Sequence, residues 1–225
     1  MGFSKGTVSF FRSLKRNNDK VWFDARKEIY ERDVVAPSRA FVVALGEKLR
    51  KIAPDIHADP RVNRSLFRIH RDIRFSADKS PYKTHLGLWM WEGARPRMEC
   101  SGFYFQLDPP EVMFACGIHI FPPAILDTFR RVVADPKRAA DLETAIRKVE
   151  KSGCAVGGDA TVRVPRGFDP HGQYAHFAKY KGLFAAVNEK IPDEFYTPAF
   201  VDYAFKRYKS MLPLHQWLKD MVDDA

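Results

Sequence analysis

The chain has 225 residues, of which 45% are hydrophobic and 13% aromatic, and its 37 Lys and Arg exceed its 28 Asp and Glu. This composition excludes a disordered chain, which lacks the apolar residues for a core, and it predicts a single domain over residues 1–225. The net charge of +9 favours an anionic partner without specifying which one.

The cysteines and the apolar runs indicate a compartment. Cys100, Cys116 and Cys154 have no framework spacing, so we expect reduced packing residues and not disulfides. The first residues do not resemble a signal peptide, and no run approaches the roughly 18 apolar residues that a membrane span needs. We therefore expect a cytoplasmic protein with no membrane partner.

The N-terminal part, residues 1–54, has helical periodicity. A short apolar stripe runs from Phe10 to Leu14, and Asn18 is a good N-cap for the helix that follows it. Pro37 interrupts the next stripe. It either kinks one long helix or lies in the first turn of a new one, where its missing N–H costs little.

The middle of the chain, about residues 62–121, changes to the period of strands. Residues 84–91 are apolar on both faces, as in a central strand. Two alternating runs, 103–107 and 112–120, flank a turn at Asp108-Pro109-Pro110-Glu111. We expect an antiparallel meander of at least three strands here.

The C-terminal part, residues 123–225, returns to a mainly helical pattern. Expected helices cover 123–133, 138–151, 174–188 and 198–222, with a break at Pro213, and a short strand is expected at Val162–Val164. Strands in the middle with helices before and after them predict an α+β fold.

The segment from Arg61 to Lys83 holds seven basic residues and two aspartates, and hence +5 of the net charge. Its arginines fit one face of a helix, but a strand with Phe67, Ile69, Ile73 and Phe75 on one face also explains the apolar residues, so we favour the strand. Arg71 would then point inward. Either the strand ends there, or Arg71 is buried with a partner. Asp72 would lie on the opposite face of a regular strand, whereas Asp78 is free to fold back to Arg71.

This segment is the candidate site. Arginine forks bind phosphate or carboxylate in a bidentate manner. The predicted ligand-binding residues are Arg68, Arg71, Arg74, Ser76, Asp78, Lys79, Tyr82 and Lys83. The candidate catalytic acid or base is Asp72 or His70. No metal or other cofactor is predicted, because the histidines and cysteines lack ligand spacing.

Three interpretations of the cluster remain open. It binds an anionic small molecule or a nucleic acid, it is an active site for an anionic substrate, or it is a structural ion-pair network. A concave pocket would favour the enzyme, a flat basic face nucleic acid, and mutual pairing of the charges the network. Tyr82, Trp89, Trp91 and Tyr104 would stack on bases if they were exposed. An exposed apolar patch would instead indicate a protein partner.

The run from Arg68 to Lys83 also closely resembles the signature of the family catalogued as domain of unknown function 2461. Further similar motifs are Phe10-Phe11 with Leu14, Asn17–Phe23, Ala115–Gly117, Pro165–Asp169 and Lys181–Leu183. One departure is Pro170-His171-Gly172, where many members have Asp-His-Pro. The resemblance covers essentially the whole chain and implies a compact bacterial-type α+β domain, but it implies no activity.

Overall fold

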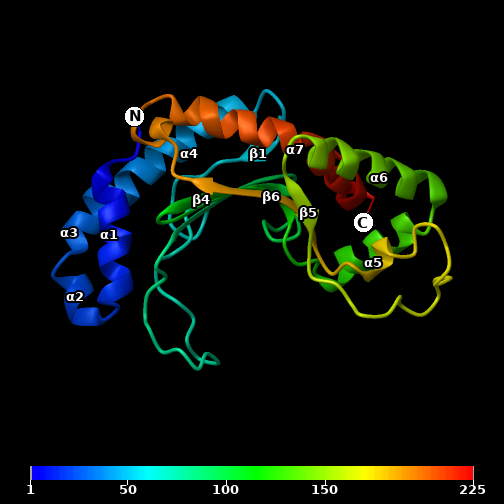
Figure 1. Cartoon of the computed structure of the whole chain (residues 1–225), viewed down its shortest axis with the longest axis horizontal. Helices are drawn as coiled ribbons and strands as arrows, with labels where there is room; N and C mark the ends of the chain where they lie inside the picture. The colour runs from blue at the N-terminus through cyan, green and yellow to red at the C-terminus, as the bar shows by residue number, and fades with distance from the viewer. Residues whose placement is uncertain (1, 225) are drawn as a thin grey trace.

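An antiparallel sheet forms the centre of the computed structural model, which describes residues 2–224 (Figure 1). In that range the strands are β1 (Ile56–His57), β2 (Leu86–Glu92), β3 (Gly102–Asp108), β4 (Glu111–Ile118), β5 (Ala155–Gly157) and β6 (Leu183–Lys190). Their order across the sheet is β1-β2-β3-β4-β6-β5, and each neighbouring pair is antiparallel. The predicted α+β fold is confirmed.

Strands β2, β3 and β4 are the predicted meander. Leu88 pairs with Phe105, and Phe105 pairs with Phe114, so apolar residues of one parity form a row across the three strands. All three side chains are fully buried. The alternating pattern of the sequence therefore marks the side of each strand that faces the core.

The N-terminal part is helical, as predicted. Its helices are α1 (Lys5–Arg16), α2 (Lys20–Asp24), α3 (Lys27–Tyr30) and α4 (Ala36–Leu49), with a π-helical turn at Glu31–Val35. Pro37 lies in the first turn of α4, which continues directly from the π-helical turn with helical dihedral angles at Val35 and Ala36. The segment is therefore one helix with a π-turn just before the proline. The prediction that Asn18 caps α2 is wrong: the Asp19 side chain accepts the cap bond, from the Trp22 N–H at 2.8 Å.

The C-terminal part contains helices and two strands. Its helical elements are α5 (Pro123–Val133), α6 (Pro136–Lys151), α7 (Phe200–Asp223) and the 3-10 turns Phe177–Lys179 and Asp193–Tyr196. The helix predicted over 174–188 is wrong, because β6 pairs there with β4 along its whole length. The strand predicted at Val162–Val164 is also wrong, and Pro213 lies inside α7.

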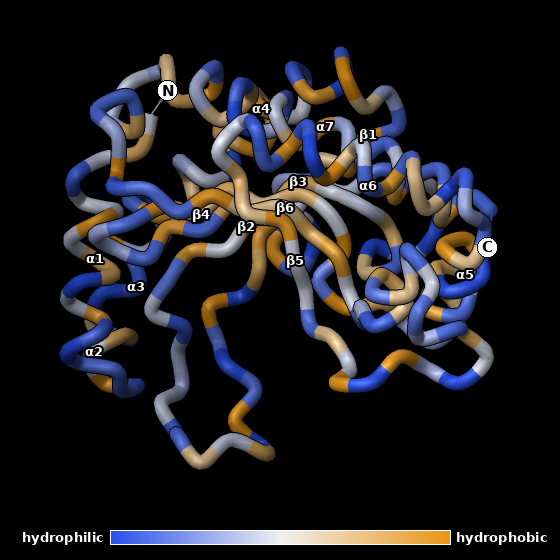
Figure 2. Tube along the Cα trace, turned by 45° about the vertical axis from the view of Figure 1, so that its right-hand side comes forward, coloured by the Kyte–Doolittle hydropathy of each residue, from blue (hydrophilic) through white to orange (hydrophobic). Residues whose placement is uncertain are grey.

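The two faces of the sheet have different surroundings. Helices α4 and α7 lie across one face (Figure 1), where the rings of Phe41 and Phe200 pack 5.6 Å and 5.5 Å from that of Phe105. We call this the covered face. The opposite face, which we call the open face, lies on the side toward which the loops before β2 and after β5 extend (Figures 1 and 2).

Candidate functional site

Residues 61–83, which we call the basic loop, precede β2 and project from the sheet (Figure 1). The strand predicted over Phe67–Phe75 is wrong, and so is the alternative helix. The loop folds back on itself through an isolated bridge between His70 and Tyr82. Phe75, which a strand would place inward, is 96% exposed. Residues 68–75 do not pair with a strand of the sheet, so their alternating apolar residues do not form a buried face.

Arg71 is bound within the loop. Its guanidinium pairs with the Asp78 carboxylate, and it also donates to the Ser80 carbonyl at 3.1 Å and to the Ser76 hydroxyl at 3.3 Å. Asp78 accepts the Ser80 N–H and O–H at 2.9 Å and 2.6 Å. The bonds from Ser80, together with Arg71, lower the pKa of Asp78 to about 2. The predicted pairing of Arg71 with Asp78 is confirmed.

A second pair lies near the tip of the loop. Arg74 donates to the Asp72 carboxylate through Nε at 2.9 Å and through Nη2 at 2.6 Å. This bidentate contact holds the pKa of Asp72 at about 2. The Lys79 ammonium donates to the Ile73 carbonyl at 3.0 Å. Asp72 is therefore exposed, ionised and paired, which gives no support to a role as an acid or base near neutral pH.

Tyr82 and His70 attach the loop to the N-terminal helices. Tyr82 is buried and stacks on Phe23 with ring centroids 4.2 Å apart, and His70 lies 5.1 Å from Tyr82. The Asn18 carboxamide donates to the Tyr82 carbonyl at 2.9 Å and accepts its N–H at 3.1 Å. The Asn18 carboxamide is thus used for contacts with Tyr82, and Asp19 makes the cap bond of α2 instead.

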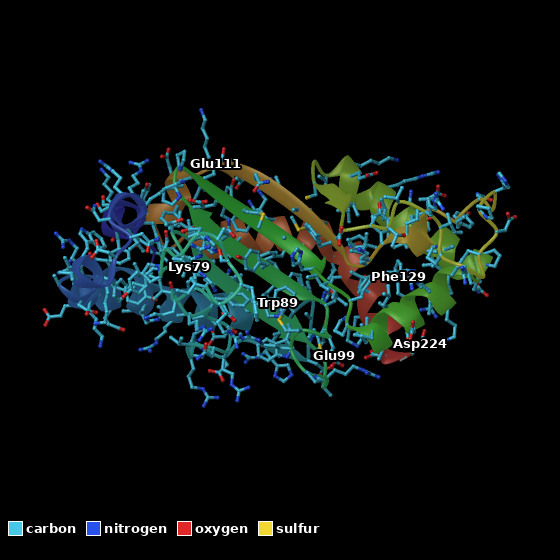
Figure 3. The ribbon with its side chains drawn as sticks, turned by 90° about the horizontal axis from the view of Figure 1, so that it is seen from below. Lys79, Trp89, Glu99, Glu111, Phe129 and Asp224 are labelled. Atoms are coloured by element: carbon cyan, nitrogen blue, oxygen red, sulfur yellow. The ribbon has the colours of Figure 1, made fainter. Side chains whose placement is uncertain are left out.

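A cleft of about 490 Å³ lies on the open face beside the basic loop. Its apolar lining includes Phe67, Trp89, Tyr104, Met113, Ala115 and Phe184, and its polar lining includes Lys83, His85, Gln106 and His119. Figure 3 looks onto this side of the molecule from below and labels Trp89 and Lys79. Among the predicted site residues, Lys83 lines the cleft. Arg71 and Asp78 instead pair with each other in the loop, and Arg74 pairs with Asp72.

Gly87 gives the cleft part of its shape. A Cβ atom at this position would lie 2.9 Å from the Tyr104 hydroxyl and 3.2 Å from the Phe67 ring. The absence of a side chain therefore lets the Phe67 ring of the basic loop approach the sheet closely. Phe67 and Tyr104 meet there in a T-shaped contact at 6.1 Å.

Two cations flank the Phe67 ring. The Lys83 ammonium lies 5.2 Å from its centroid and the Arg97 guanidinium 5.1 Å from it. Arg97 donates to the carbonyls of Asn63 and Arg64 at 2.8 Å and 2.6 Å. The hydrogen bonds of Arg97 therefore join the loop before β3 to the basic loop, and its guanidinium places a second cation beside the Phe67 ring.

Lys83 has no carboxylate partner among the residues that the structure describes. Within residues 2–224, none of the ion pairs involves its ammonium. Burial lowers its pKa, and the positive charges of Arg68 and Arg97 lower it further. The cleft thus holds a half-buried cation whose neighbours are also cations.

His85 lies next along the same wall. Burial lowers its pKa, the nearby Lys83 lowers it further, and Asp108 opposes the shift. The imidazole is therefore neutral at neutral pH. Burial also raises the pKa of Tyr104 to about 12, and its hydroxyl donates to the Gln106 side-chain oxygen at 2.9 Å. The cleft combines a cation with neutral hydrogen-bonding groups.

Some residues of the cleft were predictable from the sequence, and others were not. Trp89 and Tyr104 line the cleft, as their strand parity allowed, whereas Tyr82 and Trp91 are buried. Arg97 was not singled out. No sequence pattern marks Arg97 as a site residue, because it lies in the separate loop before β3 and contacts the basic loop only in the folded chain.

Other expectations concern the whole chain. Cys100, Cys116 and Cys154 are free and buried, as predicted. Across residues 2–224, no three His, Cys, Asp or Glu side chains are grouped so that they could hold a metal ion. In the same range, no helix has the length and apolar character needed to cross a membrane.

Comparison with known families places almost the whole chain in one of them. Residues 6–217 match the family model described as "Conserved hypothetical protein (DUF2461)", which is the family that the sequence motifs resemble. No curated protein matches the chain.

Proposed function

The chain belongs to the DUF2461 family, whose description states no activity, and from the site itself we propose that the open-face cleft binds an anionic molecule with an apolar, ring-containing body. The single observation that carries this proposal is the Lys83 ammonium, half-buried among cations without a carboxylate partner. A phosphate or carboxylate of a ligand would supply the missing opposite charge.

The lining of the cleft favours a ligand that has an apolar part. Trp89, Tyr104 and Phe184 present aromatic surface on the open face, and binding sites for small molecules are concave and mostly apolar with a few polar groups. Gln106 and His119 add hydrogen-bonding groups at the same wall. Arg68 contributes positive charge near Lys83, so the proposal keeps two residues of the predicted cluster.

His85 favours a second candidate, an enzyme that acts on the bound anion. Its neutral imidazole lines the cleft beside Lys83, where it is able to accept a proton from a bound substrate. This candidate assigns the base to His85, because Asp72 and His70 lie outside the cleft lining. It predicts turnover that is lost in His85→Gln while ligand affinity is retained.

Paired charged and neutral probes test the binding proposal. Calorimetric titration of the full chain with thymidine monophosphate and thymidine, and with 2-naphthoate and 2-naphthol, separates the charge from the ring. We expect at least one anion to bind and its neutral counterpart to bind at least about tenfold more weakly.

The matched variants are Lys83→Met and Lys79→Met. Lys83→Met is expected to weaken binding of the anion about tenfold or more, whereas Lys79→Met, which removes an ammonium exposed in the same loop, leaves the affinity within about twofold. Equal affinities for charged and neutral probes, or equal effects of the two variants, would refute the proposal.

A further inference from the structure

Nearly all the surplus positive charge of the chain lies in three loops. The basic loop carries +5, residues 93–101 carry +1, and residues 158–182 carry +2. All other residues, which form the helices and strands, share the remaining +1 of the total +9. The charge is therefore concentrated in three loops that lie outside the α-helices and strands.

These loops border the open face. Phe67 and Lys83 of the basic loop, and Met98 of the second loop, line the cleft. Figures 1 and 2 show that the basic loop and the loop between β5 and β6 extend to the same side of the sheet, apart from one another. Residues of the basic loop and of the loop before β3 thus line the cleft, and the loop between β5 and β6 extends to the same side of the sheet.

The basic loop and the loop between β5 and β6 each present an exposed apolar side chain. Phe75 in the basic loop is 96% exposed, and Val162 in the loop between β5 and β6 is 92% exposed. The Arg74 guanidinium lies 5.8 Å from the Phe75 centroid, and Arg163 follows Val162 in the sequence. An exposed ring beside a guanidinium is the arrangement on which an unpaired base stacks.

Phe75 is held by a structured loop. The Arg71–Asp78 pair, the Arg74–Asp72 pair and the bond from Lys79 to the Ile73 carbonyl enclose it on both sides in sequence. These contacts neutralise two of the loop's cations but hold the backbone on both sides of Phe75. The cost of ordering that backbone is therefore met in the free protein.

We propose that the ligand of this face is a single-stranded nucleic acid, whose phosphates lie along the basic loops while one base enters the cleft and another stacks on Phe75. This inference rests on the proposed function and names its ligand class. A single strand fits better than a duplex, because the cleft and the Phe75 ring require base faces that pairing and stacking hide in a double helix.

Fluorescence anisotropy with the full chain tests the inference. The probes are a 5′-labelled dT12 oligonucleotide, the same sequence annealed to dA12, and unlabelled thymidine monophosphate as a competitor. We expect dT12 to bind at least about tenfold more tightly than the duplex or the mononucleotide. We also expect affinity to fall steeply with salt, because each neutralised phosphate releases counterions.

Variants of Phe75 separate the loop from the cleft. Phe75→Ala is expected to weaken dT12 binding about tenfold, the size of one stacking contact, and Phe75→Trp to restore it. Val21→Ala removes another exposed apolar residue, 81% exposed on α2, and should change nothing. Neither Phe75 variant should alter affinity for the mononucleotide, whereas Lys83→Met should weaken both probes.

The outcomes distinguish this inference from the function on which it rests. If mononucleotide or naphthoate binds with dependence on Lys83 but dT12 binds no more tightly, the nucleic-acid inference fails and the cleft proposal stands. If no anion binds, both fail. Binding to vesicles of 30% phosphatidylglycerol in phosphatidylcholine, lost in Phe75→Ala, without binding to dT12, would overturn the inference in favour of a membrane surface.

Discussion

The two faces of the central sheet are built from the same strands but have opposite properties. On the covered face, Phe105 and Phe114 lie under α4 and α7 and are fully buried. On the open face, the alternate residues Tyr104 and Met113 line a cleft instead of a core. Because neighbouring side chains in a strand point to opposite faces, one sequence pattern encodes both the core and the candidate site.

The difference extends to charge. On the covered side, the buried Glu92 carboxylate bonds to the His215 ring at 2.7 Å, and the other ring nitrogen of His215 lies 2.9 Å from the Ser101 hydroxyl. On the open side, Lys83 has cations as its charged neighbours. The buried groups of Glu92, His215 and Ser101 are thus satisfied by the chain, whereas the cleft leaves the charge of Lys83 for a ligand to satisfy.

The largest expected effect comes from the covered face. Phe105→Ala should lower the free energy of unfolding by about 3–5 kcal/mol, through lost burial and the cavity that remains. Met113→Ala, which truncates a side chain on the open face, should cost less than half as much. Urea denaturation of both variants measures the difference, and equal losses would mean that the open face is packed like a core.

Glu92→Ala should have the next largest effect, about 1–3 kcal/mol, because it leaves His215 without its acceptor inside the core. The sign of the pH dependence follows from the pKa of Glu92. Burial raises this pKa, but the hydrogen bond and charge of His215 outweigh burial, and the net result is a pKa below 4.5. The carboxylate therefore stabilises the fold above that pH, and the contribution is lost as the pH falls through the folded pKa.

Unfolding midpoints of the native chain and Glu92→Ala between pH 7 and pH 3.5 check this prediction. The difference between them should shrink toward low pH. The control is Glu99→Ala, which removes a partly exposed carboxylate from the loop before β3. A constant difference across this range would show that Glu92 contributes through packing alone.

The part of the fold that could be predicted is the part in which burial imposes a hydrophobic pattern on the sequence. The meander was predictable, because residues 84–91 are apolar on both faces, residues 103–107 and 112–120 alternate, and Asp108-Pro109-Pro110-Glu111 marks the turn between the two alternating runs. Strand β6 was not, because Leu183-Phe-Ala-Ala-Val-Asn-Glu-Lys190 includes residues with good helix propensity and becomes a strand by pairing with β4.

The candidate site was predictable in place but not in composition. The charge concentration located the basic loop. Asp78 was free to pair with Arg71, as it does, but the strand from which the position of Arg71 was inferred does not exist. The cleft could not be predicted from the sequence, because it depends on the packing of Phe67, Lys83 and Arg97 beside the sheet. Such contacts join residues from separate loops, and spacing along one segment carries no information about them.

A smaller effect is expected from the unpaired cation of the open face. The lowered pKa of Lys83 means that the unfolded chain binds this proton more tightly than the folded chain. The ammonium therefore costs stability at neutral pH, and the cost is relieved as the pH rises toward 10.5, the ordinary value. Lys83→Met should be slightly more stable than the native chain at pH 7.5, with a smaller advantage at pH 9.5.

Thermal unfolding of the native chain, Lys83→Met and the control Lys79→Met measures that advantage. A bound anion should also reduce it, because the ligand stabilises only the chain that has the ammonium. If Lys83→Met were destabilised at both pH values, Lys83 would be a structural residue, and the contrast between the two faces would be lost.

The smallest expected effect concerns His85 and gives the finest test of the open face. Its lowered pKa means that the folded chain favours the neutral ring, so the native chain should lose stability as the pH falls below 6.5, the ordinary value. His85→Gln should reduce that loss, whereas His171→Gln, at an exposed position, should leave it unchanged. Unfolding midpoints at pH 7.5 and pH 5.5 give the comparison. If the loss of stability between pH 7.5 and pH 5.5 were the same in all three chains, His85 would be solvated. The cleft would then be too open to hold a neutral base beside Lys83.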